Sequence, residues 1–279
     1  MARLGLAIGG VALVLLGGAV AAWGALDRDE ERTDPVAGIG RVVLDGGSGS
    51  VEVRYAPGGR GQVTQHVQRW GLAAWGDGDE AGHRVEGDTL VLDAGCGWNC
   101  SVSYQVTLPT PVPVEGELDS GSLSAVGMRS VRAEFRSGSV DAREVSGPVD
   151  VRTGSGSVHL AGVDGPVTVR TRSGSIDLAD VAGRVEAKAG SGGISGADLR
   201  GAEVVVETGS GQIELQLTGP RSAEVTTGSG GIDLTVPADR YRVETDTGSG
   251  GVDVDVVQDP AAEKRLVLST GSGDVRVRS

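Results

Sequence analysis

The fold of this chain is decided by the stretch SGSVHLAGVDGPVTVRTRSG, which spans residues 155–174. Val158 and Leu160 alternate with polar residues, and so do Val167 and Val169. This alternation is typical of short strands that bury one face. Glycine and proline lie between the two runs and not inside them, where they would interrupt a strand ladder. The stretch therefore predicts one structural unit that contains two strands and two corners.

The same unit recurs along most of the chain. The serine of each Ser-Gly step lies 17 to 23 residues after the previous one, at Ser120, Ser137, Ser155, Ser173, Ser191, Ser210, Ser229, Ser249 and Ser272. An earlier copy begins at Ser48. One unit cannot bury its few apolar side chains alone, but a stack of units about 4.8 Å apart pairs every strand. The sequence predicts an all-β fold, a parallel β-solenoid of the right-handed β-helix type with about 18–20 residues per coil. An antiparallel meander is the alternative, but it does not require a single register.

Two inward columns follow from the aligned units. The first contains Val140, Val158, Ile176, Ile194, Ile213, Ile232, Val252 and Val275, and the second contains Val151, Val169, Ala187, Val206, Val225 and Val243. The strand Val275–Ser279 would then be the bare C-terminal edge. Arg276 and Arg278 are charges of the kind that protect such an edge. The alternative is an edge that docks another chain, including a second copy.

Composition excludes several classes of protein. The chain has 48 glycines, 3% aromatic residues and a net charge of −13. A thick layered enzyme core normally depends on aromatic bulk, so we expect no such core in this chain. A nucleic-acid binder depends on neutralising phosphates, which an acidic chain does poorly, so we expect no nucleic-acid partner.

The N-terminus predicts a membrane anchor. Residues 4–26 carry no charge, and as a helix they would span a hydrocarbon core of about 30 Å. A cleaved signal peptide, with its site near Ala19–Ala21, is the alternative. We divide the chain into an anchor with an acidic juxtamembrane stretch at 1–34, a strand-rich N-terminal cap or first part of the solenoid at 35–115, and repeated coils at 116–279. The predicted location is the cell membrane, single-pass, with the β domain extracytoplasmic.

Two cysteines, Cys96 and Cys100, are separated by three residues. Outside the cytoplasm such a pair is usually a structural disulfide. A metal site would need two further soft ligands, and a redox motif would more often have two intervening residues. We therefore expect a disulfide and no cofactor.

Outward positions offer two charged runs. Glu214, Asp233 and Asp253 would be neighbours in a sequential stack, which makes them a weak candidate cation site, and a solvated acidic face is the favoured interpretation. On the other strand Arg152, Arg170 and Lys188 form a basic run that suits an anionic polymer or simply faces solvent. No motif for a nucleophile, a catalytic metal or a phosphate loop is present in the sequence. We expect no catalytic residues.

The segment Tyr104–Pro109, followed by recurrent Thr-Gly-Ser-Gly-x-Val/Ile steps, resembles a bacterial "putative adhesin" domain family of unknown function. The resemblance covers about residues 40–279. It implies a solenoid behind one membrane helix and supplies no catalytic residues. The first hypothesis is a non-enzymatic, adhesin-like envelope protein that binds envelope proteins or glycans. The alternatives are a self-assembling scaffold similar to bactofilins, an accessory of envelope-stress signalling, and a glycan-active β-helix enzyme.

Overall fold

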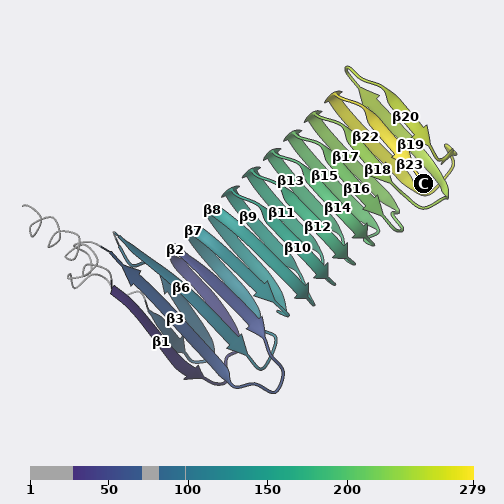
Figure 1. The fold of residues 1–279 in the computed structure, drawn as a ribbon. Helices are drawn as coiled ribbons and strands as arrows, with labels where there is room; N and C mark the ends of the chain where they lie inside the picture. The colour runs from purple at the N-terminus through teal and green to yellow at the C-terminus, as the bar shows by residue number, and fades with distance from the viewer. Residues whose placement is uncertain (1–27, 71–81, 98) are drawn as a thin grey trace, which may run out of the picture.

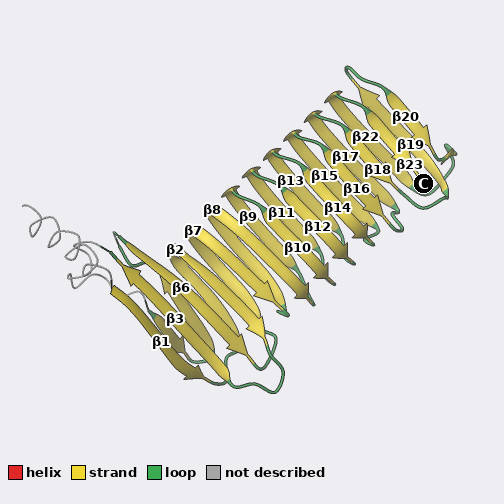
Figure 2. Ribbon diagram, viewed as in Figure 1, coloured by secondary structure: helices red, strands yellow, loops and turns green. Residues whose placement is uncertain are grey.

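The computed structural model describes residues 28–70, 82–97 and 99–279. Over these residues the chain forms one long stack of strands and no helix (Figures 1 and 2). The predicted membrane-spanning segment, residues 4–26, lies outside the described residues. Within them, no helix has the length and apolar character needed to cross a membrane.

The first eight strands build the N-terminal end of the stack. They are β1 (Arg28–Val36), β2 (Arg41–Tyr55), β3 (Gly61–Arg69), β4 (His83–Glu86), β5 (Thr89–Ala94), β6 (Cys100–Leu108), β7 (Pro113–Val126) and β8 (Ser130–Val145). β2 pairs in parallel with β7 on one side and with β5 and β6 on the other. β1 and β3 continue antiparallel from β6, and β4 is antiparallel to β5. The expected division at residue 34 falls inside β1, and the expected cap, 35–115, contains a full coil, β2.

The middle of the stack consists of regular coils of two strands each. The strands are β9 (Val149–Ser155), β10 (Val158–Val163), β11 (Val167–Ser173), β12 (Ile176–Val181), β13 (Val185–Ser191), β14 (Ile194–Leu199), β15 (Glu203–Ser210), β16 (Ile213–Leu217), β17 (Ser222–Ser229) and β18 (Ile232–Thr235). Odd strands pair in parallel with odd strands, and even strands with even strands. This pattern confirms the predicted parallel solenoid. Its handedness stays a prediction.

The core is a thin layer between the two faces of each coil. Val158 lies between Val140 and Ile176, and Val169 lies between Val151 and Ala187. All six side chains are buried, and burial of each valine or isoleucine contributes about 1.5–3 kcal/mol. Branched aliphatic side chains fill so thin a core without aromatic bulk.

Glycine is required at the corner where the two strands of a coil meet. Gly174 has a φ of +140°, and a Cβ there would overlap the carbonyl oxygen of Gly156 in the preceding coil. Nearby threonines use the same carbonyl groups: Thr208 and Thr227 donate hydrogen bonds to the carbonyls of Gly192 and Gly211, at 3.0 and 3.1 Å. The corner threonines are thus joined to the backbone of the neighbouring coil by hydroxyl-to-carbonyl hydrogen bonds.

The C-terminal coils are not stacked in chain order. The remaining strands are β19 (Arg240–Thr247), β20 (Val252–Asp255), β21 (Val257–Gln258), β22 (Arg265–Ser272) and β23 (Val275–Arg278). β22 lies between β17 and β19, and β23 lies between β18 and β20 (Figure 1). The last coil is therefore inserted, and the coil that precedes it in sequence is outermost.

This order corrects two predictions. Val275–Ser279 is not a bare edge, because Val275 is paired on both sides and is 0% exposed. Val252 does not continue the first buried column, because it is 47% exposed. In the second column Val225 is followed along the stack by Leu268 and then by Thr245. Val243 therefore does not continue this column. The free edge at this end belongs to β19, β20 and β21.

Buried tyrosines lie near both ends of the core. Near the N-terminal end the Tyr104 hydroxyl donates a hydrogen bond to the carbonyl of Asp93 at 2.6 Å. Near the C-terminal end the Tyr241 hydroxyl donates to the carbonyl of Pro237 at 2.9 Å. Burial raises the pKa of both phenols. Each hydroxyl stays protonated and satisfies a backbone carbonyl where the repeat stops.

Candidate functional site

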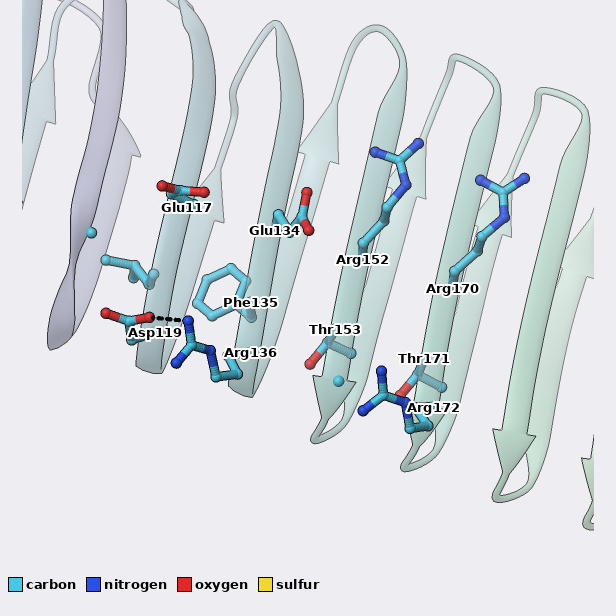
Figure 3. Close-up of a pocket in the computed structure, with 13 residues that line it drawn as sticks. Glu117, Asp119, Glu134, Phe135, Arg136, Arg152, Thr153, Arg170, Thr171 and Arg172 are labelled. Atoms are coloured by element: carbon cyan, nitrogen blue, oxygen red, sulfur yellow. Dashed lines mark ion pairs between the residues drawn. The ribbon is translucent and has the colours of Figure 1, made fainter.

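A groove of about 540 Å³ lies on the odd-strand side of the solenoid, over β7, β8, β9 and β11 (Figure 3). Two rows of outward side chains border it, one residue from each strand per row. Because the strands are parallel and in register, each row runs along the solenoid axis with a step of about 4.8 Å. The groove therefore presents side chains at a fixed spacing set by the backbone.

The first row changes from acidic to basic along the axis. Glu117 is the register partner of Glu134, Glu134 of Arg152, and Arg152 of Arg170. Figure 3 shows the side chains of Arg152 and Arg170 side by side on neighbouring strands. Lys188 extends the row beyond the groove and donates a hydrogen bond to Glu207 at 2.9 Å. That hydrogen bond raises the pKa of the Lys188 ammonium group.

The second row lies nearer the corner and contains a gap. It consists of Asp119, Arg136, Gly154 and Arg172, each of which directly follows a buried residue in sequence. Gly154 has no side chain, and a Cβ there would overlap the carbonyl oxygen of Arg136. The missing side chain leaves an open floor between Arg136 and Arg172.

Four guanidinium groups border the groove, which we call the arginine groove: those of Arg136, Arg152, Arg170 and Arg172. They differ in how they are neutralised. Arg136 pairs with Asp119 at 3.3 Å, Arg152 with Asp150 at 3.1 Å and Arg170 with Glu186 at 2.6 Å. Arg172 forms no ion pair with any residue that the structure describes. All these pairs lie at the surface, where an ion pair contributes at most about 1 kcal/mol, so the groups stay available to a ligand.

A second depression lies on the even-strand side, over the small residues Ala179 and Ala197. His159, Asp177 and Ser195 lie beside it on three successive coils. Ser195 donates a hydrogen bond to Asp177 at 2.6 Å. A catalytic triad needs histidine between serine and the acid, so that the imidazole can accept the hydroxyl proton. Here the acid occupies the middle position, and this order does not activate Ser195.

The candidate acidic ladder is interrupted. Glu214 and Asp233 are register partners, but the next coil along the stack supplies Arg276, and Asp253 lies beyond it. Arg278 of the same coil forms an ion pair with Asp233 at 2.6 Å. The expectation that the three carboxylates are consecutive neighbours is therefore wrong, and the cause is the inserted last coil. Among the described residues no group of three or more His, Cys, Asp or Glu side chains could hold a metal ion.

Cys96 and Cys100 form a disulfide, with their Cα atoms 5.7 Å apart. The bond closes the chain between β5 and β6, at the N-terminal end of the stack. It links two cysteines that are close in sequence, as the sequence predicted.

The family model for Toastrack DUF4097 matches residues 138–279, which is 142 of the 279 residues. The chain belongs to this family. The match agrees with the resemblance seen in the sequence. The Toastrack region contains Arg152, Arg170 and Arg172, whereas Glu117, Asp119 and Arg136 precede it. The arginine groove thus spans the start of the matched region.

The chain also matches solved structures that carry adhesin names. A "putative adhesin" from Bacteroides fragilis is 11% identical, with 90% of this chain and 97% of that chain covered and a TM-score of 0.38. One from Parabacteroides merdae is 12% identical, with 88% and 96% covered and a TM-score of 0.40. A "putative cell adhesion protein" from Clostridium sporogenes is 12% identical, with 90% and 99% covered and a TM-score of 0.25. No curated protein matches the chain.

The sequence located only half of the groove. Alternation identified Arg152 and Arg170 as outward residues of one row. Arg136 and Arg172 continue the same alternation, because each directly follows a buried residue, but they were not predicted. The signal that could have found them is the column that contains Arg136, Gly154 and Arg172 when the units are aligned on their serines.

Proposed function

We propose that this chain is a non-enzymatic, adhesin-like binding protein of the bacterial cell envelope. Residues 4–26 hold it to the membrane, and the solenoid acts outside the cytoplasm. The observation that carries the proposal is the arginine groove. Its outward side chains are fixed on backbone ladders, which suits recognition of a ligand with repeated features.

Two further features support the extracytoplasmic location. The disulfide between Cys96 and Cys100 is of a kind that persists in oxidising compartments. The apolar run of residues 4–26 is long enough to span a bilayer as a helix. Exposure of the solenoid at the cell surface would give the groove access to envelope polymers and to other proteins.

The test uses the full chain with a tag after Ser279, expressed in intact cells. Protease added outside should remove the tag, and crosslinking should recover envelope proteins or glycans. A tag that resists external protease in intact cells but is cleaved after lysis would place the domain inside and contradict the proposal. A variant with Arg152→Gln and Arg172→Gln should recover less partner than the wild-type chain.

A self-assembling scaffold is the second candidate, and the outermost coil favours it. Val252 on β20 is 47% exposed and Val257 on β21 is 61% exposed, on the free edge of the stack. Filaments that form with rising concentration and are lost in Val252→Lys would support this function. A chain that stays monomeric at high concentration would exclude it.

A further inference from the structure

We infer that the arginine groove binds an acidic polysaccharide laid along the solenoid axis, with its anionic groups over Arg152, Arg170 and Arg172. The inference rests on the proposed binding function and names the class of ligand. The ligand's charges are carboxylates or phosphates, because a guanidinium group donates two parallel hydrogen bonds to either one.

The size and direction of the groove favour an oligomer. Its charged side chains come from four neighbouring strands, three steps of about 4.8 Å, so they extend over about 14 Å. The volume of about 540 Å³ is far more than a single anion fills. The floor at Gly154 is open, and the guanidinium groups follow the axis on either side of it. A linear ligand with regularly spaced charges matches this arrangement better than one small ion.

The distribution of charge favours a glycan over other polyanions. Arginines gather over β9 and β11, whereas Glu117, Asp119 and Glu134 border the end over β7 and β8. Carboxylates accept hydrogen bonds from sugar hydroxyl groups but repel a uniformly charged strand. A nucleic acid or a polyphosphate would bring phosphates against these acids and against a net charge of −13. An acidic sugar chain offers hydroxyl donors to one end and anionic acceptors to the other.

Arg172 is the residue whose role is easiest to separate from stability. It forms no ion pair within the described part of the chain, and its side chain is exposed. Replacing it with glutamine removes a charge without leaving a carboxylate unpaired. The exposed Arg184 and Arg200 provide a matched control. They lie away from the groove, Arg184 in the connection from β12 to β13 and Arg200 in the connection from β14 to β15. They form ion pairs with Glu203 and Asp180, respectively.

The experiment measures binding of the purified full chain, in detergent, to four probes. These are tetragalacturonate, a phosphate-bearing oligosaccharide of equal charge, neutral maltotetraose and inorganic phosphate. We expect at least one acidic oligomer to bind, and to bind more weakly as salt is added. The oligomer that binds tighter identifies the anionic group. The double variant Arg152→Gln/Arg172→Gln should weaken binding about tenfold, since each exposed charge contributes up to about 1 kcal/mol. The control Arg184→Gln/Arg200→Gln should not.

Several results would overturn the inference. They are no binding of either acidic oligomer, equal weakening by both double variants, or binding of maltotetraose or phosphate as tight as that of the acidic oligomers. A single-stranded oligonucleotide that binds equally well would also overturn it. Thermal melting of each variant separates lost binding from lost folding. If both acidic oligomers fail while crosslinking in cells still recovers an envelope partner, the glycan inference fails and the proposed binding function stands.

Discussion

The guanidinium group of Arg278 donates a hydrogen bond to the carboxylate of Asp233, 45 residues earlier in the chain, at 2.6 Å. The bond joins the last coil directly to β18, although β19, β20 and β21 intervene in sequence. Arg276 of the same coil lies between Asp233 and Asp253. Along the stack, the coil of β17 and β18 is therefore followed by the coil of β22 and β23 and then by the coil of β19 and β20. A pair of substitutions can test this order.

The substitution Val275→Asp should destabilise the protein far more than Val252→Asp. Val275 is 0% exposed between β18 and β20, so a charge there is buried without a partner, at a cost of several kcal/mol. Val252 is 47% exposed, and its substitution should cost less than about 1 kcal/mol. Chemical denaturation of the two variants measures both. A stack in chain order would give the reverse ranking.

Alanine at Gly174 should destabilise the corner, whereas alanine at Gly219 should not. Gly174 has a φ of +140°, and a Cβ would overlap the carbonyl oxygen of Gly156. Strain and overlap together should cost about 3 kcal/mol. Gly219 has no atom within 4 Å of the position where a Cβ would be. Thermal melting of both variants measures the difference, and equal melting temperatures would contradict the stacked-glycine corner.

Valine at Thr171 and at Thr208 should have different effects, although both side chains are buried. The Thr208 hydroxyl donates to the Gly192 carbonyl at 3.0 Å, so Thr208→Val should cost about 1 kcal/mol. The Thr171 hydroxyl is buried without a hydrogen-bond partner in the described structure. Thr171→Val should therefore leave the free energy of unfolding unchanged or raise it by up to about 1 kcal/mol. A loss at Thr171 as large as at Thr208 would show that its hydroxyl is bonded in solution.

Mild acid should weaken the N-terminal end through His83. Burial is the main reason that the pKa of His83 lies below its ordinary value, although Asp34 opposes the shift. The fold therefore favours the neutral imidazole. Its contribution to stability is full above pH of about 6.5 and is lost as pH falls toward the lowered folded pKa.

Urea unfolding at neutral pH and in mild acid, for the wild-type chain and His83→Gln, isolates this effect. The wild-type chain should lose more stability between the two conditions than the variant. Equal losses would mean that His83 binds its proton as readily in the folded protein as in the unfolded chain.

The stacked coils were predictable because one physical pattern repeats. Val158, Ile176 and Ile194 occupy equivalent places in successive units, and only parallel stacking buries all of them at once. The corner glycines and the disulfide between Cys96 and Cys100 also follow from local sequence. Each of these features depends on residues within one unit and its immediate neighbour.

The order of the end coils was not predictable from the period, because the units at Ser249 and Ser272 both fit against the unit at Ser229. The difference lies in their apolar residues. The inserted coil brings Leu266 and Leu268, which are buried, whereas β19 offers Val243 and Thr245 at the matching positions. An interior coil must bury both flanks, and the coil richer in leucine does so. The candidate cation site failed for the same reason, since Glu214, Asp233 and Asp253 were aligned in chain order.

The insertion of the last coil between two others has a mechanical consequence. A solenoid whose terminal coil is outermost can be peeled strand by strand when its end is pulled. Here β23 is held on both sides, by β18 and by β20. Tension applied at Ser279 must break two ladders together before any strand leaves the stack. The inserted coil therefore makes the stack resist unravelling when tension is applied at Ser279.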